Sequence, residues 1–135
     1  MKKYLTGLVL ASALIVPAFS KAQVSIPFFY AKKSFVAQTA AIPTYTLFTA
    51  PADGDYVIHT YTEMGPGTSG ATLIISWTDD FGVQTASYGI TAGLHTNTVP
   101  ATIHAISGTP VTVAVTYDPG SGATAYNLFF TILGQ

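Results

Sequence analysis

Three histidines are the side chains of this chain that could bind a transition metal. They are His59, His95 and His104, and no two of them form a His-x-His pair on one strand. His59 is followed by Glu63 four residues later, but no second ligand motif follows. A metal site needs three or four converging ligands. We therefore interpret the histidines as unrelated strand or loop residues, and we expect neither a metal ion nor another cofactor.

The aspartates gather in predicted turns, where Asp53-Gly54-Asp55 could supply two ligands to calcium. Calcium is bound by several carboxylate and carbonyl oxygens. Aspartate is also a good turn former, and that role alone explains these two residues together with Asp79, Asp80 and Asp118. We expect turn formation, and a calcium site at Asp53 and Asp55 stays as an alternative.

Residues for covalent or acid–base catalysis are sparse. The sequence contains no Gly-x-Ser-x-Gly elbow, and Ser121 belongs to a Pro-Gly turn. Paired carboxylates that cleave glycosides need a deep cleft, for which a small domain with short loops has little room. We assign no catalytic residue and expect a protein that is not an enzyme.

Aromatic side chains could instead stack on sugar rings. The candidates are Trp77, Tyr61 and Tyr88. Trp77 alternates onto the same strand face as Leu73 and Ile75, which favours a place in the core. Because Tyr61 and Tyr88 stay as candidates, a carbohydrate-binding module is our alternative function.

The elements that must position these residues are β-strands. Apolar residues alternate at period two, and turn residues interrupt them every 8–12 positions, which is typical of a β-sandwich. We predict an all-β protein with a single jelly-roll-like antiparallel sandwich of seven or eight strands. The predicted strands include 45–49, 56–63, 71–78, 83–90, 111–117 and 126–133.

The last predicted strand is apolar on both faces. Tyr126, Leu128, Phe130 and Ile132 alternate onto one face, while Phe129 and Leu133 lie on the other. A strand of this kind is buried on both sides, yet a two-sheet sandwich covers only one. The second face, with Phe129 and Leu133, is a candidate interface with another subunit; alternatively, an N-terminal arm folds back over it.

Two stretches resemble a known jelly-roll family. Residues 48–58 (FTAPADGDYVI) resemble the F-x-A/C-P-x-x-G-x-Y-x-F strand–turn–strand of tumour necrosis factor and complement globular heads. Residues 126–133 resemble the terminal apolar strand of that family, which lies centrally and faces a trimer axis. The resemblance implies a jelly roll and a trimer. It implies no chemistry, and no calcium or receptor residues carry over.

The chain is also similar to uncharacterised small β-sandwich proteins of bacteria and phages with a G-x-Y-x-V … W-T-D-D-x-G … Y-N-L pattern. The matching positions are Gly54, Tyr56, Ile58, Trp77, Thr78, Asp79, Asp80, Gly82, Tyr126, Asn127 and Leu128. These are turn and core residues, so the similarity concerns the fold.

The N-terminus indicates export. Two lysines precede an apolar run, and Ser20-Lys21-Ala22 places small residues for cleavage before Gln23, as in a secretory signal. We predict a signal peptide at 1–22, an N-terminal arm at 23–43 and a sandwich domain at 44–135. No membrane insertion is expected after cleavage.

The charge pattern restricts the partners. After residue 22, two lysines stand against six acidic residues, giving a formal net charge of −4, and no Lys or Arg follows residue 33. Nucleic acid normally requires a cationic patch, so we exclude it. Cysteine is absent. We expect a secreted or cell-surface protein, with the periplasm as an alternative, that has a structural or adhesive role and forms a homo-oligomer.

Overall fold

The computed structural model describes residues 28–65, 70–91, 95–97, 100–118 and 125–135. The predicted signal peptide and its cleavage point before Gln23 lie outside these residues, as does Ser121. No helix that could cross a membrane occurs in the part of the chain that is described.

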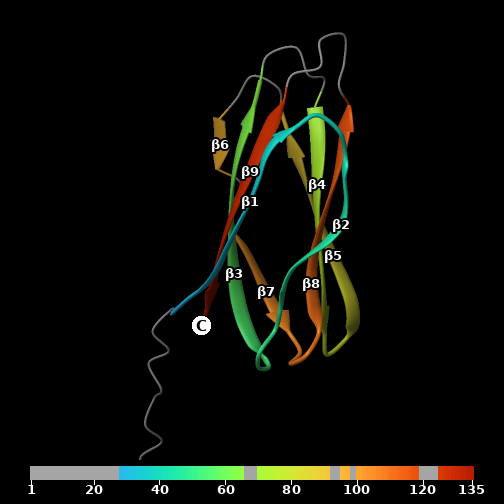
Figure 1. The fold of residues 1–135 in the computed structure, drawn as a ribbon. Coiled ribbons are helices and arrows are strands. Elements are labelled where there is room, and N and C mark those ends of the chain that lie inside the picture. Colours follow the sequence, from blue (N-terminus) through green and yellow to red (C-terminus); the bar gives the residue numbers. More distant parts are fainter. Residues whose placement is uncertain (1–27, 66–69, 92–94, 98–99, 119–124) are drawn as a thin grey trace, which may run out of the picture.

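Within these described residues, nine antiparallel strands form two facing sheets (Figure 1). Sheet A has the order β1-β9-β3-β6, with β7 also paired to β3, and sheet B has the order β2-β8-β4-β5. The strands are β1 (Phe28–Gln38), β2 (Ile42–Thr49), β3 (Gly54–Met64), β4 (Gly70–Asp79), β5 (Gly82–Ile90), β6 (His95–Asn97), β7 (Ala101–Ala105), β8 (Pro110–Asp118) and β9 (Tyr126–Gly134).

The strand pairing is nested. The first strand pairs with the last, β2 with β8, β3 with both β7 and β6, and β4 with β5. The short strands β6 and β7 lie one after the other along the same edge of β3, so they occupy one strand position. The sandwich therefore has eight strand positions. Their nested pairing is that of a long hairpin rolled into two sheets, which is the arrangement of a jelly roll. The predicted fold class is confirmed.

Alternation along the strands builds the core between the sheets. In β9, the residues Tyr126, Leu128, Phe130 and Ile132 are each at most 1% exposed. They meet Leu73, Ile75, Val111, Val113 and Val115 of sheet B, which are equally buried. The face of β9 that meets the core is therefore the one beginning at Tyr126, and Phe129 and Leu133 point away from it.

The sandwich begins earlier in the chain than the sequence indicates. Residues 28–38 form β1 beside β9, and β2 starts at Ile42, so β1 and the start of β2 lie within the segment interpreted as an arm. Register shifts between Phe29 and Ala31 and between Phe35 and Gln38 break the period-two pattern of β1. Such bulges conceal an edge strand from periodicity. The six strands predicted by their residue ranges are confirmed within three residues at each end.

Candidate functional site

The outer face of sheet A carries a strip of three cross-strand pairs along its two central strands, aromatic at one end, polar in the middle and aliphatic at the other end. Phe129 on β9 pairs directly with Tyr61 on β3, and their ring centroids lie 6.0 Å apart. Two residues further along each strand, Thr131 pairs with His59, and beyond them Leu133 pairs with Val57. We call Val57, His59, Tyr61, Phe129, Thr131 and Leu133 the sheet A strip.

Hydrogen bonds from Asn127 hold one end of this strip in place. The side-chain amide of Asn127 donates to Oε2 of Glu63 (2.8 Å), and its Oδ1 accepts the backbone N–H of Ala37 (2.7 Å). Ala37 has a φ of +54°, which is an unusual left-handed conformation for a residue with a Cβ. Asn127 thus ties β9 to β3 and to the end of β1, which fixes the position of Phe129 next to it.

A shallow depression of about 320 Å³ lies beside the strip, between β1 and β9. Its lining includes Lys32, Lys33, Phe129 and Thr131. The ammonium group of Lys33 lies 4.6 Å from the ring centroid of Tyr45 on β2, within cation–π distance. The lysine therefore covers the open side between the two sheets at their edge strands.

The described part of the N-terminal segment does not cross over the strip. It lies edge-on beside β9, and Phe35 points toward the core, with its ring 6.1 Å from that of Phe130. Ile26 lies outside the described residues, and the side chains of Phe28 and Phe29 are not described. For residues 30–38, the expectation that the arm covers Phe129 and Leu133 is wrong, because these residues complete the sheet instead of covering its face.

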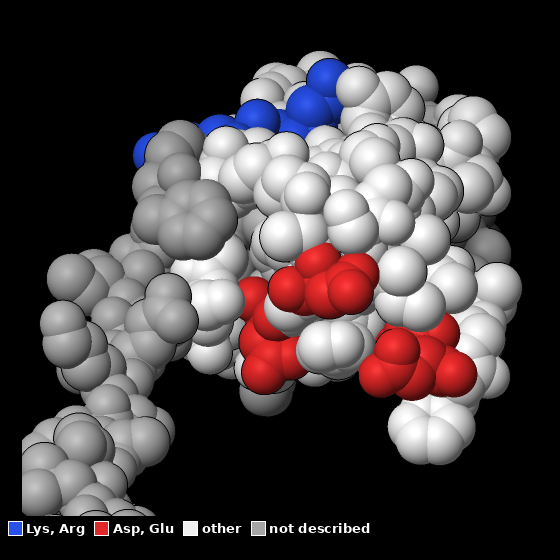
Figure 2. Space-filling view, turned by 90° about the horizontal axis from the view of Figure 1, so that it is seen from below, with Lys and Arg blue, Asp and Glu red and all other residues white. Residues whose placement is uncertain are grey.

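A group of acidic side chains lies at the end of the sandwich that carries the β2–β3, β4–β5 and β7–β8 turns. Figure 2 shows carboxylates gathered at this end and lysines along one side of the molecule. Asp79 and Asp80 occupy the β4–β5 turn, and Oδ1 of Asp79 accepts the backbone N–H of Phe81 (2.8 Å). This is the turn-forming role that the sequence indicates for aspartate.

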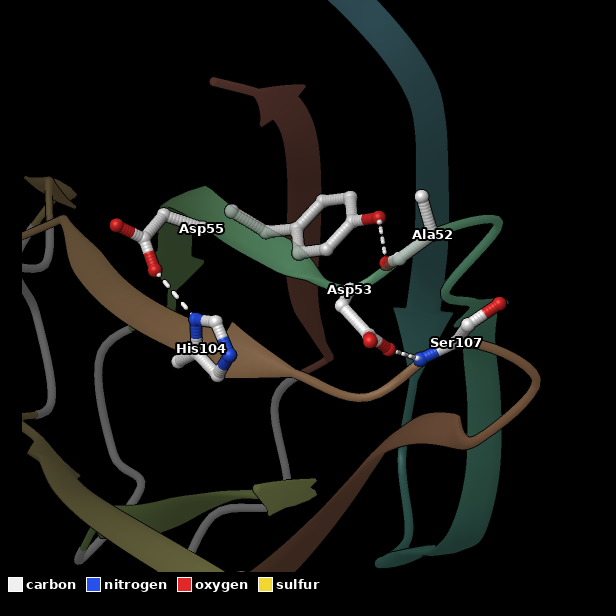
Figure 3. Close-up of polar contacts among 6 residues, drawn as sticks. Ala52, Asp53, Asp55, His104 and Ser107 are labelled. Carbon is white, nitrogen blue, oxygen red and sulfur yellow. Dashed lines mark hydrogen bonds and ion pairs between the residues drawn. The ribbon is translucent and has the colours of Figure 1, made fainter. Parts of the chain in front are cut away.

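Asp53 and Asp55, the calcium candidates, both have protein partners (Figure 3). Oδ1 of Asp53 accepts the backbone N–H of Ser107 (2.6 Å), which joins the β2–β3 and β7–β8 turns. Oδ1 of Asp55 lies 2.8 Å from Nδ1 of His104 on β7. Among the described residues, no three or more His, Asp or Glu side chains are grouped so that they could hold a metal ion.

The ion pair changes the titration of His104. The hydrogen bond to Asp55 raises the pKa of His104 above its ordinary value of 6.5, and the charges of Asp55, Asp80 and Asp53 act in the same direction. Both side chains are exposed to solvent. Topology brings the two residues together across the β3–β7 pair, and their separation in sequence gave no signal that could have identified them.

The three aromatic candidates for sugar stacking do not form one platform. Trp77 and Tyr88 lie on the inner side of sheet B, where both are half-buried and pack against the core. Tyr61 alone lies on the outer face of sheet A, beside Phe129. The sequence identified Tyr61 and Phe129 separately, and only the strand register shows that they are neighbours.

Neither a protein-family model nor a curated protein matches this sequence. A partial structural likeness is found to a solved structure from Bacillus endospore appendages, described as a novel family of disulfide-linked pili. The two chains are 14% identical over 80% of this chain and 83% of the other, with a TM-score of 0.42. This likeness is too distant to carry an argument about function.

Proposed function

We propose that this chain is an exported, non-enzymatic structural or adhesive protein of a cell or particle surface, and that it self-associates through the sheet A strip. The observation that carries the proposal is that β9 has apolar residues on both of its faces. Its inner face completes the core with residues at most 1% exposed, while Phe129 and Leu133 lie outside that core. Both side chains are only half-buried in a single chain, so each keeps apolar surface that a partner could cover.

The composition of the strip supports contact with another protein surface. Aromatic residues are enriched at the centres of protein interfaces, and Phe129 and Tyr61 form an aromatic pair on the two central strands of sheet A. Asn127 and Glu63 are hydrogen-bonded to each other at its margin. Apolar side chains next to satisfied polar groups are found in protein interfaces.

We further propose that the oligomer contains three subunits. The resemblance of residues 126–133 to the terminal strand of the tumour necrosis factor and complement heads implies three subunits around β9. Closed rings are also the usual outcome when identical subunits associate. A secreted or cell-surface location is part of the same proposal, and it rests on the N-terminal export pattern.

The test is the solution mass of the chain from Gln23 onward, which contains every described strand. Light scattering should give a multiple of the monomer mass at micromolar concentration. Phe129→Asp should divide that mass by the number of subunits around the strip, three for a trimer, with unchanged circular dichroism. Thr46→Asp places the same charge on an exposed position of β2 in sheet B and should leave the mass unaltered. A wild-type monomer would contradict the proposal.

The alternative is a carbohydrate-binding module that uses the same face. It is favoured by one observation, the outward position of Tyr61 beside Phe129. The two functions make opposite predictions for Tyr61→Ala and Phe129→Asp. In a sugar-binding protein, both variants lose retention on polysaccharide without any change of mass. In an assembling protein, the mass changes and no polysaccharide is retained.

A further inference from the structure

The four sheet edges formed by the described strands differ in how they are protected against pairing with another chain. Edge strands are normally blunted by lysine, proline, bulges or short length. Lys32 and Lys33 and two register shifts occur in β1, while Pro43 and two further shifts occur in β2. The edge of sheet A beyond β3 is divided into the short strands β6 and β7.

The remaining edge, β5, has none of these features. It runs for nine residues (GVQTASYGI) without a charged residue or proline. Its register with β4 is continuous from Gly82 to Ile90, so it contains no bulge. Within the described ranges, β4 is its only strand partner. A long, regular and uncharged edge is a template for further strand pairing.

Gly89 in β5 has no explanation within one copy of the chain. Glycine weakens a strand, and it usually marks a bulge, a bend or the close approach of a ligand or another backbone. Gly89 lies in unbroken register opposite Thr72, and it is absent from the glycines with positive φ. A Cβ built at Gly89 would meet no atom within 4 Å. The close approach of another molecule is among the roles that glycines in strands have.

We propose that the open edge of β5 pairs antiparallel with the same edge of a second copy, which joins two sheets B into one eight-stranded sheet. A two-fold axis at Ala86, the midpoint of β5, pairs all nine residues. This register places Val83 opposite Gly89 of the second copy and Phe81 opposite its Thr91. Large side chains across from glycine cover its exposed backbone.

The shape of the surface around Gly89 fits this register. A depression of about 410 Å³ is lined by residues that include Gly70, Thr72, Gly89, Thr91 and Tyr117. A cavity of ~150 Å³ holds a benzene ring, so the depression has room for a phenyl group. Phe81 is 92% exposed and Val83 is 77% exposed. Each copy thus has an apolar projection at one end of β5 and a depression at the other.

Charge selects the antiparallel orientation. A parallel pair would place the two Asp79-Asp80 turns side by side, and the repulsion would oppose association. In the antiparallel pair, nine residues at ~3.3 Å each separate the two turns by roughly 30 Å. This exceeds the screening length of ~8 Å at physiological salt. The edge is therefore self-complementary in shape and free of like-charge contacts. The contact is separate from the sheet A strip and adds to the proposed self-association.

The first test uses solution mass in the Phe129→Asp background, which removes the other proposed contact. This protein should be a dimer, and Val83→Lys should convert it to a monomer because a lysine blunts the edge. Phe81→Ser should weaken the dimer by about tenfold, as expected for loss of an anchoring aromatic residue. Thr46→Lys, on the opposite edge strand of sheet B, is the matched control and should leave the dimer intact.

The second test is cross-linking in the otherwise unaltered chain, which contains no cysteine. Ala86→Cys should form a disulfide-linked dimer under mild oxidation, since the two-fold axis places residue 86 opposite itself. Thr46→Cys should not. A monomeric Phe129→Asp protein together with no excess cross-linking at residue 86 would overturn the β5 proposal. A change of mass on Phe129→Asp without any effect of Val83→Lys would refute the β5 contact and leave the sheet A strip supported.

Discussion

Three phenylalanines at different depths provide a direct measure of the packing described above. Phe130 is 1% exposed in the core, Phe129 is the next residue on the opposite face of β9, and Phe81 is 92% exposed. The change is the same in each case, Phe→Ala. The differences in unfolding free energy between the three variants therefore reflect the surroundings of each phenylalanine and not the type of substitution.

The expected cost for Phe130→Ala follows from its burial. An aromatic side chain buries ~150–250 Å², and ~25 cal/mol/Å² converts this area to about 4–6 kcal/mol. Alanine retains part of that area, so the loss should be about 3–5 kcal/mol, the range for such changes in cores. Phe81→Ala should stay within about 0.5 kcal/mol. Phe129→Ala should fall between, at about 1–2 kcal/mol.

Urea unfolding followed by circular dichroism would measure these values, at concentrations low enough for each variant to be monomeric. The reasoning fails if Phe129→Ala costs the monomer as much as Phe130→Ala. Phe129 would then belong to the core of a single copy, and the sheet A strip would lose its basis as an interface. A cost below 1 kcal/mol for Phe130→Ala would contradict the packing itself.

Three further predictions concern local chemistry. His104 should titrate above pH 6.5 in NMR, and Asp55→Asn should lower the pKa of His104. The contribution of this ion pair to stability is present below pH 6.5, and it is lost as pH rises through the raised pKa. Burial beside Tyr117 raises the pKa of Tyr126 to about 12, so the absorbance of its phenolate should appear at a higher pH than that of an ordinary tyrosine. The free energy of unfolding should fall as pH rises from about 10 to 12, because the unfolded chain loses this proton first. Ala37→Gly should increase the free energy of unfolding, measured in urea, by up to about 1 kcal/mol, because glycine adopts a φ of +54° without strain. No change or a decrease would contradict that account.

The sequence predicted the strands with strict alternation better than it predicted the sheet edges. In β4, β8 and β9 the core residues recur at every second position, so both the strand and its inner face follow from the pattern. In β1 the bulges interrupt the alternation, and two lysines give the segment the appearance of a solvent-exposed arm. The short strands β6 and β7 contain too few residues for a periodic pattern to be recognised.

The candidate sites divide in the same way. Alternation separated Phe129 and Leu133 from the core residues of β9, but it could not show that Tyr61 lies beside Phe129, since that depends on the register of β3. The partners of Asp53 and Asp55 come from the β7–β8 turn and from β7, about fifty residues away. Long-range pairing of this kind depends on topology, which residue types do not specify.

The nested strand order has a consequence for how the chain becomes folded. The strand β9 lies between β1 and β3 in sheet A and follows every other described strand in the chain. Until residues 126–134 are present, β1 has no partner among the described strands, and the core lacks the four buried side chains of β9. Pairings this distant in sequence form slowly, whereas synthesis adds ~5–20 residues per second. A partly made chain therefore stays open, which agrees with the export across a membrane that we propose for it.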